Sequence, residues 1–147
     1  MMKQAGCELC EHAATAAWSL VHAGERLRVV RVLDAPEFPA FYRVIWNEHV
    51  AEMSDLSHVD RAHLMDAVLA VEHVLRTSLK PTKINLATLG NVVPHLHWHV
   101  IARFDWDSHF PQPIWGSRQR TPEPPAGQRL AVPLTELDDR VRRALNA

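Results

Sequence analysis

The sequence has no apolar run near the roughly 20 residues that a membrane-spanning helix requires, and its N-terminus lacks the apolar core of a secretory signal peptide. It also has little net charge, because 16 Lys and Arg against 17 Asp and Glu give a formal charge of −1. Proteins that bind duplex nucleic acid or a membrane surface usually carry a basic face, so we expect neither partner. Two cysteines among 147 residues exclude a disulfide framework as the basis of the fold. We therefore expect a cytoplasmic globular protein.

The chain has enough apolar residues for one hydrophobic core. Hydrophobic residues make up 47% of it and charged residues 22%, which predicts a single domain over residues 1–147. Apolar residues recur at intervals of three and four before Pro81, and this spacing predicts a long helix. We expect strands over 26–33, 41–46, 83–89 and 92–104, and helices over 59–79 and 134–145. This order predicts an α+β fold, an antiparallel sheet packed by one long helix and a C-terminal helix.

The other segments carry weaker signals. Residues 13–20 are interpreted as either a short helix or an irregular segment, and the proline-rich residues 105–128 as a long surface loop. Trp106 and Trp115 in that loop are candidates for stacking on a base or on a partner subunit. Arg103, just before the loop, is expected to be a solvated surface residue; the alternative is that it neutralises a phosphate.

Three of the ten histidines alternate with apolar residues in the segment HLHWH. In a strand, His95, His97 and His99 project from one face, while Leu96 and Trp98 point into the core. Three imidazoles on one face suit two kinds of chemistry. They can ligate a metal, or one can attack phosphorus as a neutral nucleophile while its protonated neighbours offset the phosphate charge.

The segment 95–101, HLHWHVI, resembles the motif of the histidine-triad (HIT) superfamily at every position. The resemblance runs from the cysteine pair to about Trp115. It implies a HIT-like α+β fold and a nucleotide-binding enzyme, usually a homodimer, that hydrolyses or transfers nucleotidyl groups. It also implies that His97 is the nucleophile, that His99 stabilises the transferred phosphate, and that His95 bonds within the triad or binds metal.

The same resemblance assigns the nucleotide contacts. Asp34 would take the ribose hydroxyls, and Asn85 and Asn91 would contact phosphate oxygens. Val92 stands where many relatives carry serine or threonine, so a hydroxyl that could meet a phosphate is missing. Residues 109–115 resemble a bacterial subgroup labelled diadenosine-tetraphosphate-hydrolase-like, a label that names a substrate class.

The spacing of Cys7 and Cys10 lets both thiolates reach one tetrahedral zinc ion. His49 and His95 are the candidates for the other two ligands. The galactose-1-phosphate uridylyltransferase branch of the superfamily has a similar site, and the resemblance implies a structural zinc that pins residues 1–12 against the histidine strand. The alternative is a pair of free cysteines in a flexible tail.

We therefore expect a nucleotide-phosphate hydrolase or nucleotidyl transferase that needs no cofactor for catalysis. It would act at an α-phosphorus through a nucleotidyl-histidine intermediate, on dinucleoside polyphosphates, nucleoside phosphoramidates or acyl-adenylates. Two alternatives stay open. One is a nucleotide-binding module or sensor with little turnover, and the other is a metal-dependent enzyme whose triad holds the metal.

Overall fold

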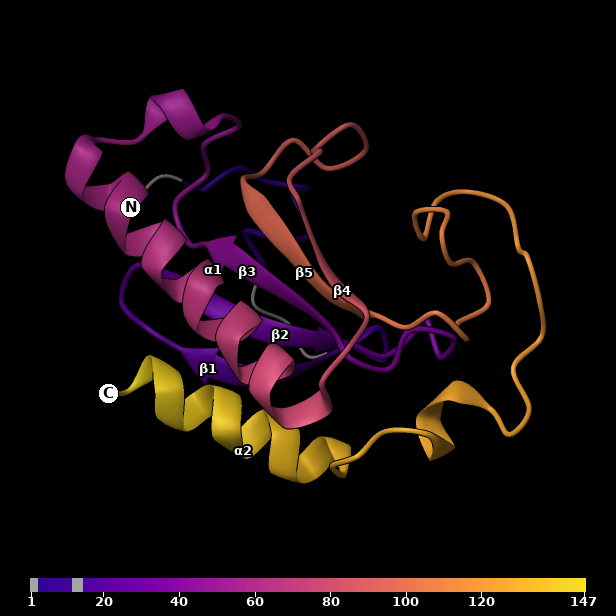
Figure 1. Ribbon diagram of the computed structural model, residues 1–147. Coiled ribbons are helices and arrows are strands. Elements are labelled where there is room, and N and C mark those ends of the chain that lie inside the picture. Colours follow the sequence, from indigo (N-terminus) through magenta and orange to yellow (C-terminus); the bar gives the residue numbers. More distant parts are fainter. Residues whose placement is uncertain (1–2, 12–14) are drawn as a thin grey trace.

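The computed structural model describes residues 3–11 and 15–147. Its centre is a five-stranded sheet in the order β1-β2-β3-β5-β4, in which every neighbouring pair is antiparallel. Helices α1 and α2 cover one face of this sheet (Figure 1). This arrangement confirms the predicted α+β fold. The elements are β1 Trp18–Ala23, β2 Leu27–Val32, β3 Phe41–Trp46, α1 His58–Leu79, β4 Lys83–Ala87, β5 His97–Arg103 and α2 Leu134–Leu145, with short 3-10 helices at Met53–Asp55 and Ala126–Gln128.

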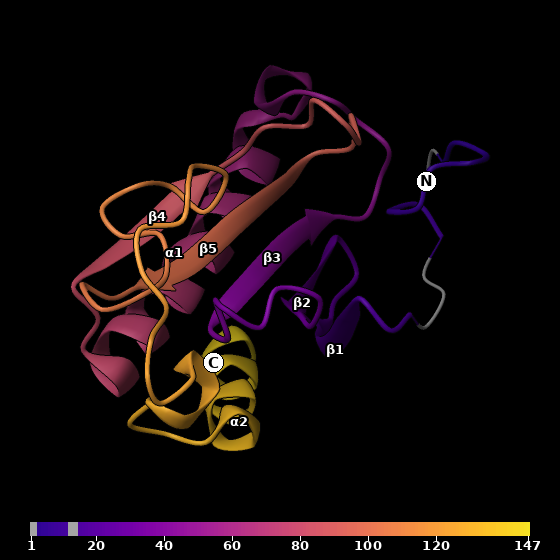
Figure 2. The ribbon, with the colours of Figure 1, turned by 90° about the vertical axis from the view of Figure 1, so that its right-hand side faces the viewer.

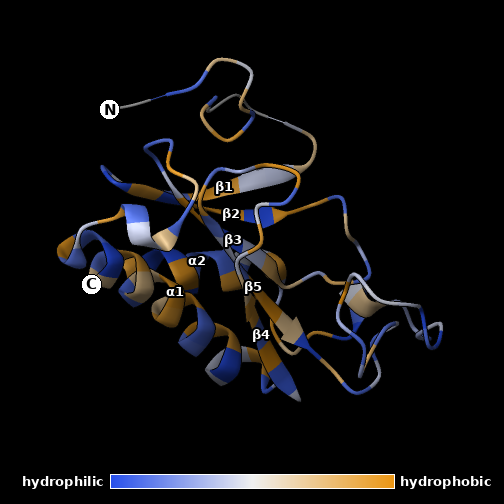
Figure 3. Ribbon diagram, turned by 90° about the horizontal axis from the view of Figure 1, so that it is seen from above, coloured by the Kyte–Doolittle hydropathy of each residue, from blue (hydrophilic) through white to orange (hydrophobic). Residues whose placement is uncertain are grey.

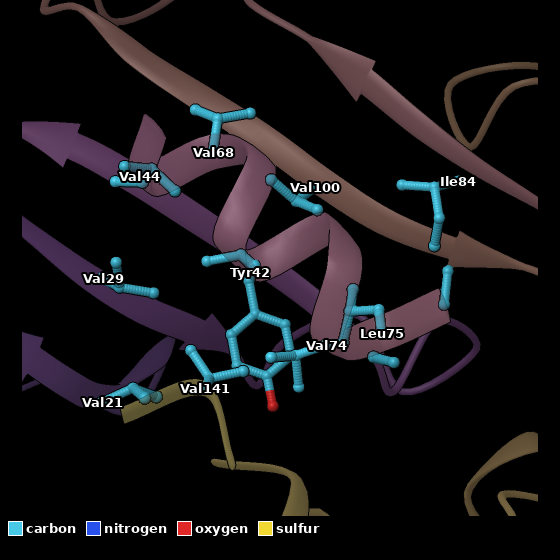
Figure 4. Close-up of a cluster of buried hydrophobic side chains, with 14 of the residues drawn as sticks. Val21, Val29, Tyr42, Val44, Val68, Val74, Leu75, Ile84, Val100 and Val141 are labelled. Carbon is cyan, nitrogen blue, oxygen red and sulfur yellow. The ribbon is translucent and has the colours of Figure 1, made fainter. Parts of the chain in front are cut away.

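Helix α1 forms where the apolar spacing predicts it. The Ser57 hydroxyl caps it by accepting a hydrogen bond from the Asp60 backbone NH, and it ends at Lys80, which adopts a left-handed conformation. The apolar residues of α1 that face the sheet are fully buried, namely Leu64, Val68, Val71 and Leu75. Figure 4 shows Val68 and Leu75 beside side chains from the strands and Val141 of α2, and all of these residues belong to one core.

The opposite face of the sheet is covered by two segments that are far apart in sequence. Seen from above, the N-terminal segment and helix α1 lie on opposite sides of the strands (Figure 3). Leu9 and both cysteines pack there against Val30 of β2 and Ile45 of β3. The chain after β5 leaves the sheet at one end and crosses to α2 (Figure 2). The histidines of β5 therefore lie on a face of the sheet that loops partly cover.

The largest differences from the predicted boundaries are at β1 and β5, and β4 also ends at Ala87, two residues early. Residues 18–20 belong to strand β1 and not to a helix or irregular segment; residues 12–14 lie outside the described part of the chain. The sequence of this edge strand shows little of the alternation that predicts a strand, because Val21 is its only buried residue and a register shift interrupts it between Leu20 and His22. Strand β5 begins at His97 and not at residue 92. Pro94 has no NH to donate to a ladder, and the His95 NH bonds instead to the Val93 carbonyl at 2.8 Å.

Within the described residues, no helix is long and apolar enough to cross a membrane.

Candidate active site and metal centre

His97 lies on the face of the sheet that α1 does not cover, opposite Ile45 in β3. Its Nδ1 lies 2.6 Å from the backbone oxygen of His95. Because a carbonyl oxygen only accepts, Nδ1 carries the proton and Nε2 keeps its lone pair. Burial lowers the pKa of His97, and the positive charge of Arg43 acts in the same direction. The ring is thus fixed in the neutral tautomer that a nitrogen nucleophile needs.

His99 stands beside His97, with ring centroids 5.0 Å apart in an edge-to-face arrangement. The ring centroids of Phe41 and Trp115 lie 5.5 and 5.4 Å from the centroid of the His99 ring. Its buried Nδ1 has no hydrogen-bond partner among the described residues. Burial, followed by the charges of His97 and Arg43, lowers the pKa of His99 to about 3. The expectation of protonated neighbours around the nucleophile is therefore wrong for His99, which is neutral and can offer a phosphate only hydrogen bonding.

His95 is fully buried and belongs to a second cluster. Its Nε2 donates to the Trp46 carbonyl at 2.6 Å, so its Nδ1 carries the lone pair. That Nδ1 lies 3.5 Å from Cys7 Sγ, 3.4 Å from Cys10 Sγ and 3.2 Å from His49 Nδ1. The triad is therefore divided between two sites, because His95 turns away from His97 and His99.

The second cluster is a Cys2His2 arrangement. The ligand atoms of Cys7, Cys10, His49 and His95 all lie within 4.8 Å of one another. Two sulfurs and two imidazole nitrogens are the donor set of a closed tetrahedral zinc site. The Trp46 carbonyl that orients His95 is the kind of outer hydrogen bond that metal-bound histidines usually make. The residues present fit a structural zinc ion.

The three residues predicted to contact the nucleotide differ in solvent exposure. Asp34 is exposed in the turn after β2, and its charge acts on Arg43. Asn91 is exposed in the turn that follows Gly90, whose φ of 75° requires glycine. Asn85 is half-buried on β4, and its side-chain oxygen accepts from Arg103 Nη1 at 2.8 Å. That bond leaves the amide NH2 of Asn85 as the group able to meet a phosphate oxygen.

A family model described as the HIT domain matches residues 19–106, more than half of the chain. The chain belongs to the HIT family. Curated AP-4-A phosphorylases from two strains of Mycobacterium tuberculosis are 32% identical to it over 89 residues, which is 56% of this chain and 46% of each relative. The chain thus spans about half the length of these curated relatives.

Solved structures of HIT proteins share the fold. A histidine triad protein from Bradyrhizobium japonicum is 30% identical, with 88% of this chain and 89% of that chain covered and a TM-score of 0.66. One from Marinobacter aquaeolei VT8 is 21% identical, with 99% and 98% covered and a TM-score of 0.72. A histidine triad family protein from Mycobacterium smegmatis, described as Zn-bound, is 18% identical, with 95% and 91% covered and a TM-score of 0.57.

In this HIT protein, a buried ion pair holds the loop that approaches His99. Arg103 and Asp107 are each 2% exposed, and Arg103 Nε and Nη2 lie 2.8 and 3.0 Å from the Asp107 oxygens. The guanidinium also lies 5.5 Å from the ring centre of Phe38 and 5.8 Å from that of Phe110. The expectation that Arg103 is a solvated surface residue is therefore wrong. Asp107 is only four residues away, but the sequence pattern could not reveal that Phe38 and Asn85 reach Arg103 from distant segments.

The two loop tryptophans have different surroundings. Trp115 is 55% exposed and touches His99, so it is placed to stack on a ligand. Trp106 stacks on Phe104 with centroids 4.7 Å apart, and the Arg129 guanidinium lies 4.1 Å from its ring centre. Trp106 also packs against the main core on the helix side. Of the two, only Trp115 lies beside the histidines.

Replacing Asp107 with asparagine is expected to lower the free energy of unfolding by about 3–5 kcal/mol, because it leaves the Arg103 charge buried without a counter-charge. Urea unfolding at neutral pH measures this. Asp139→Asn is the control, since it breaks an exposed pair with Arg142 that is expected to contribute about 0–1 kcal/mol. Equal losses in the two variants would contradict the anchoring role of Asp107.

The same pair gives a pH dependence of stability. Burial alone raises the pKa of Asp107, but hydrogen bonds from Arg103 and three backbone NH groups outweigh it and hold the pKa below its ordinary 3.8. A depressed pKa stabilises the fold fully above pH 3.8 and loses that contribution as the pH falls through the folded-state pKa. Asp107→Asn should therefore flatten the acid limb of the stability profile relative to the wild type.

Proposed function

We propose that this HIT protein is a nucleotide-phosphate hydrolase or nucleotidyl transferase that works through a covalent bond between His97 and the α-phosphorus. The observation that carries the proposal is the 2.6 Å hydrogen bond from His97 Nδ1–H to the His95 carbonyl. It leaves Nε2 with a free lone pair, on a ring whose pKa is lowered by burial. A neutral, oriented imidazole is an activated nucleophile at neutral pH.

The reaction proceeds in two displacements. His97 Nε2 forms a bond to the α-phosphorus as the bond to the leaving group breaks, and the leaving group departs with its electron pair and takes up a proton from solvent. An acceptor then attacks the same phosphorus and releases its proton to solvent, the phosphorus–nitrogen bond breaks, and its electrons return to Nε2. The His99 ring, Asn85 and Asn91 hydrogen-bond the phosphate, and Asp34 binds the ribose hydroxyls.

The proposed substrates are dinucleoside polyphosphates, nucleoside phosphoramidates or acyl-adenylates. The curated relatives are AP-4-A phosphorylases, which supports a dinucleoside polyphosphate. The acceptor distinguishes two activities. Water as acceptor gives a hydrolase that releases a nucleoside monophosphate, whereas inorganic phosphate gives a transferase that releases a nucleoside diphosphate.

We also propose that Cys7, Cys10, His49 and His95 hold a structural zinc ion. The ion would cross-link the N-terminal segment to the start of β5, and four protein ligands would leave it no open position for substrate. The catalytic scheme needs no metal because His97 supplies the nucleophile. The alternative in which the triad itself holds a metal is disfavoured, since the free nitrogen of His95, Nδ1, lies beside Cys7, Cys10 and His49 and not beside His97 and His99. The resemblance to HIT proteins supports one domain over residues 1–147 and a homodimer.

The test is incubation with diadenosine tetraphosphate, an adenosine phosphoramidate and an aminoacyl-adenylate, with and without inorganic phosphate. We expect at least one substrate to release AMP in water, or ADP when phosphate is the acceptor. Activity measured directly after addition of excess chelator, before the structural zinc dissociates, should equal the activity without chelator. Tight nucleotide binding without product from any substrate would instead support the sensor alternative.

A further inference from the structure

A positively charged residue that the triad motif does not include lies beside the histidines. Arg43 is opposite His99 in the register between β3 and β5. Cross-strand partners point to the same face, so the guanidinium shares the face of His97 and His99. It also lies 5.6 Å from the ring centre of Phe41, which itself contacts His99. Three neighbouring side chains therefore place Arg43 in the wall of the proposed site.

The guanidinium lacks a hydrogen-bonding partner where it is buried. Arg43 Nε is inaccessible to solvent and unbonded among residues 3–11 and 15–147. Asp34 and Glu8 favour its charge, yet in the same part of the chain neither carboxylate forms an ion pair with it. A charged donor without an acceptor costs free energy, and the terminal nitrogens of this half-buried side chain can donate to a bound anion.

His99 and Val92 do not supply the positive charge that would stabilise a phosphate in this site. His99 is neutral at physiological pH, so it brings no charge to a phosphate. Val92, where many HIT proteins carry a hydroxyl, is 93% exposed and offers no hydrogen bond. The pentacoordinate phosphorus formed by attack of His97 carries negative charge on its non-bridging oxygens. Preorganised donors at that position stabilise such a charge strongly.

We propose that Arg43 is a catalytic residue that binds the non-bridging oxygens of the phosphate transferred to His97. This inference rests on the proposed function and adds to it a charged phosphate clamp from strand β3. Arg43 thereby selects substrates with an anionic α-phosphate over the uncharged nucleoside. Its planar fork can bond two phosphate oxygens at once, which a lysine cannot reproduce.

The sequence alone could not single out Arg43. Arg43 follows two aromatic residues in the strand segment FYR, and nothing in this segment marks it as part of a site. Alternation along one strand also does not show which other strand lies next to the histidines. The pairing of β3 with β5, which joins residues 56 positions apart, supplies that information.

The first test compares nucleotide and nucleoside binding in Arg43→Met, Arg43→Lys and the control Arg76→Met. Arg76 is exposed on α1, on the other side of the sheet, so its loss changes net charge equally. We expect Arg43→Met to weaken AMP or GMP binding about 10- to 100-fold, the range for one hydrogen-bonded charge, and to change adenosine or guanosine binding less than about twofold. Arg43→Lys should recover part of the loss, and Arg76→Met should match the wild type.

The second test measures formation of the His97 adduct in a single turnover. Arg43→Met should slow it about 10- to 100-fold or more, and added guanidinium ion should restore part of the rate of Arg43→Ala, whose small side chain leaves room for the ion. Equal loss of nucleoside and nucleotide binding would show a structural role and overturn the inference, as would a wild type that binds nucleotide no better than nucleoside. If the wild type forms the adduct and Arg43→Met forms it as fast, the inference alone fails. If nucleotide binding depends on Arg43 but no adduct forms, the nucleophilic mechanism fails and the phosphate contact stands.

Discussion

Replacing His97 with asparagine is expected to lower turnover by at least about 10³-fold while leaving the melting temperature close to that of the wild type. Asparagine retains an NH that can donate to the His95 carbonyl, the bond that orients the ring in the wild type. It has no nitrogen lone pair that can attack phosphorus. The variant therefore removes the nucleophile and keeps the hydrogen bond that its surroundings need.

Two further variants make this result specific to the nucleophile. His97→Gly leaves a space in which added imidazole can act as the attacking nitrogen, so imidazole should restore part of its activity and none of the activity of His97→Asn. His73→Asn removes an exposed histidine from α1, on the other side of the sheet, and should leave turnover unchanged. A His97→Asn enzyme with turnover within about tenfold of the wild type would contradict covalent catalysis, since loss of a covalent nucleophile removes the route itself.

Removing the metal is expected to lower the stability of the fold. An ion whose free concentration is 1,000 times its Kd stabilises the folded state by about 4 kcal/mol. For a chain of this length that corresponds to roughly 10 °C in melting temperature. The N-terminal segment should respond most, because it contributes two of the four ligands, Cys7 and Cys10. Its Leu9 and the cysteines also cluster with Val30, Ile45, Trp18 and Val93, and Arg28 Nη2 donates to the Leu9 carbonyl at 2.5 Å.

Elemental analysis should find one zinc per chain, and chelation should lower the melting temperature and expose the N-terminal segment to proteolysis. Cys10→Ala should behave like the chelated protein and gain nothing from added zinc. Cobalt substitution provides a spectroscopic readout, because two thiolates and two imidazoles around Co²⁺ give intense visible absorption. Metal-free protein from zinc-replete medium, with a melting temperature unaffected by chelator, would contradict a structural zinc.

The sequence predicts the histidine face well because that feature is local. Alternation places His97 and His99 together, and the structure has them on one face of β5. The same alternation fails for His95, because Pro94 delays the start of the strand and lets the ring turn to the cysteines. The spacing of Cys7 and Cys10 indicates a metal site.

The parts that the sequence does not predict depend on distant contacts. Arg43 lies beside His99 because β3 pairs with β5, and Phe38 and Asn85 reach Arg103 from segments far from it in the sequence. Strand β1 is held by pairing with β2 and has little apolar pattern of its own. In each case the information lies in tertiary pairing, which periodicity along one segment does not contain.

The most direct test of covalent catalysis by His97 is to quench the enzyme with labelled substrate during its first turnover and to locate the label by mass spectrometry. We expect a nucleotidyl group on the peptide that contains His97, attached through a phosphorus–nitrogen bond that survives alkali and is lost in acid. The adduct should appear before product and decay as product forms. Label on any other residue, or product formed at full rate with no adduct on His97, would contradict covalent catalysis by this residue.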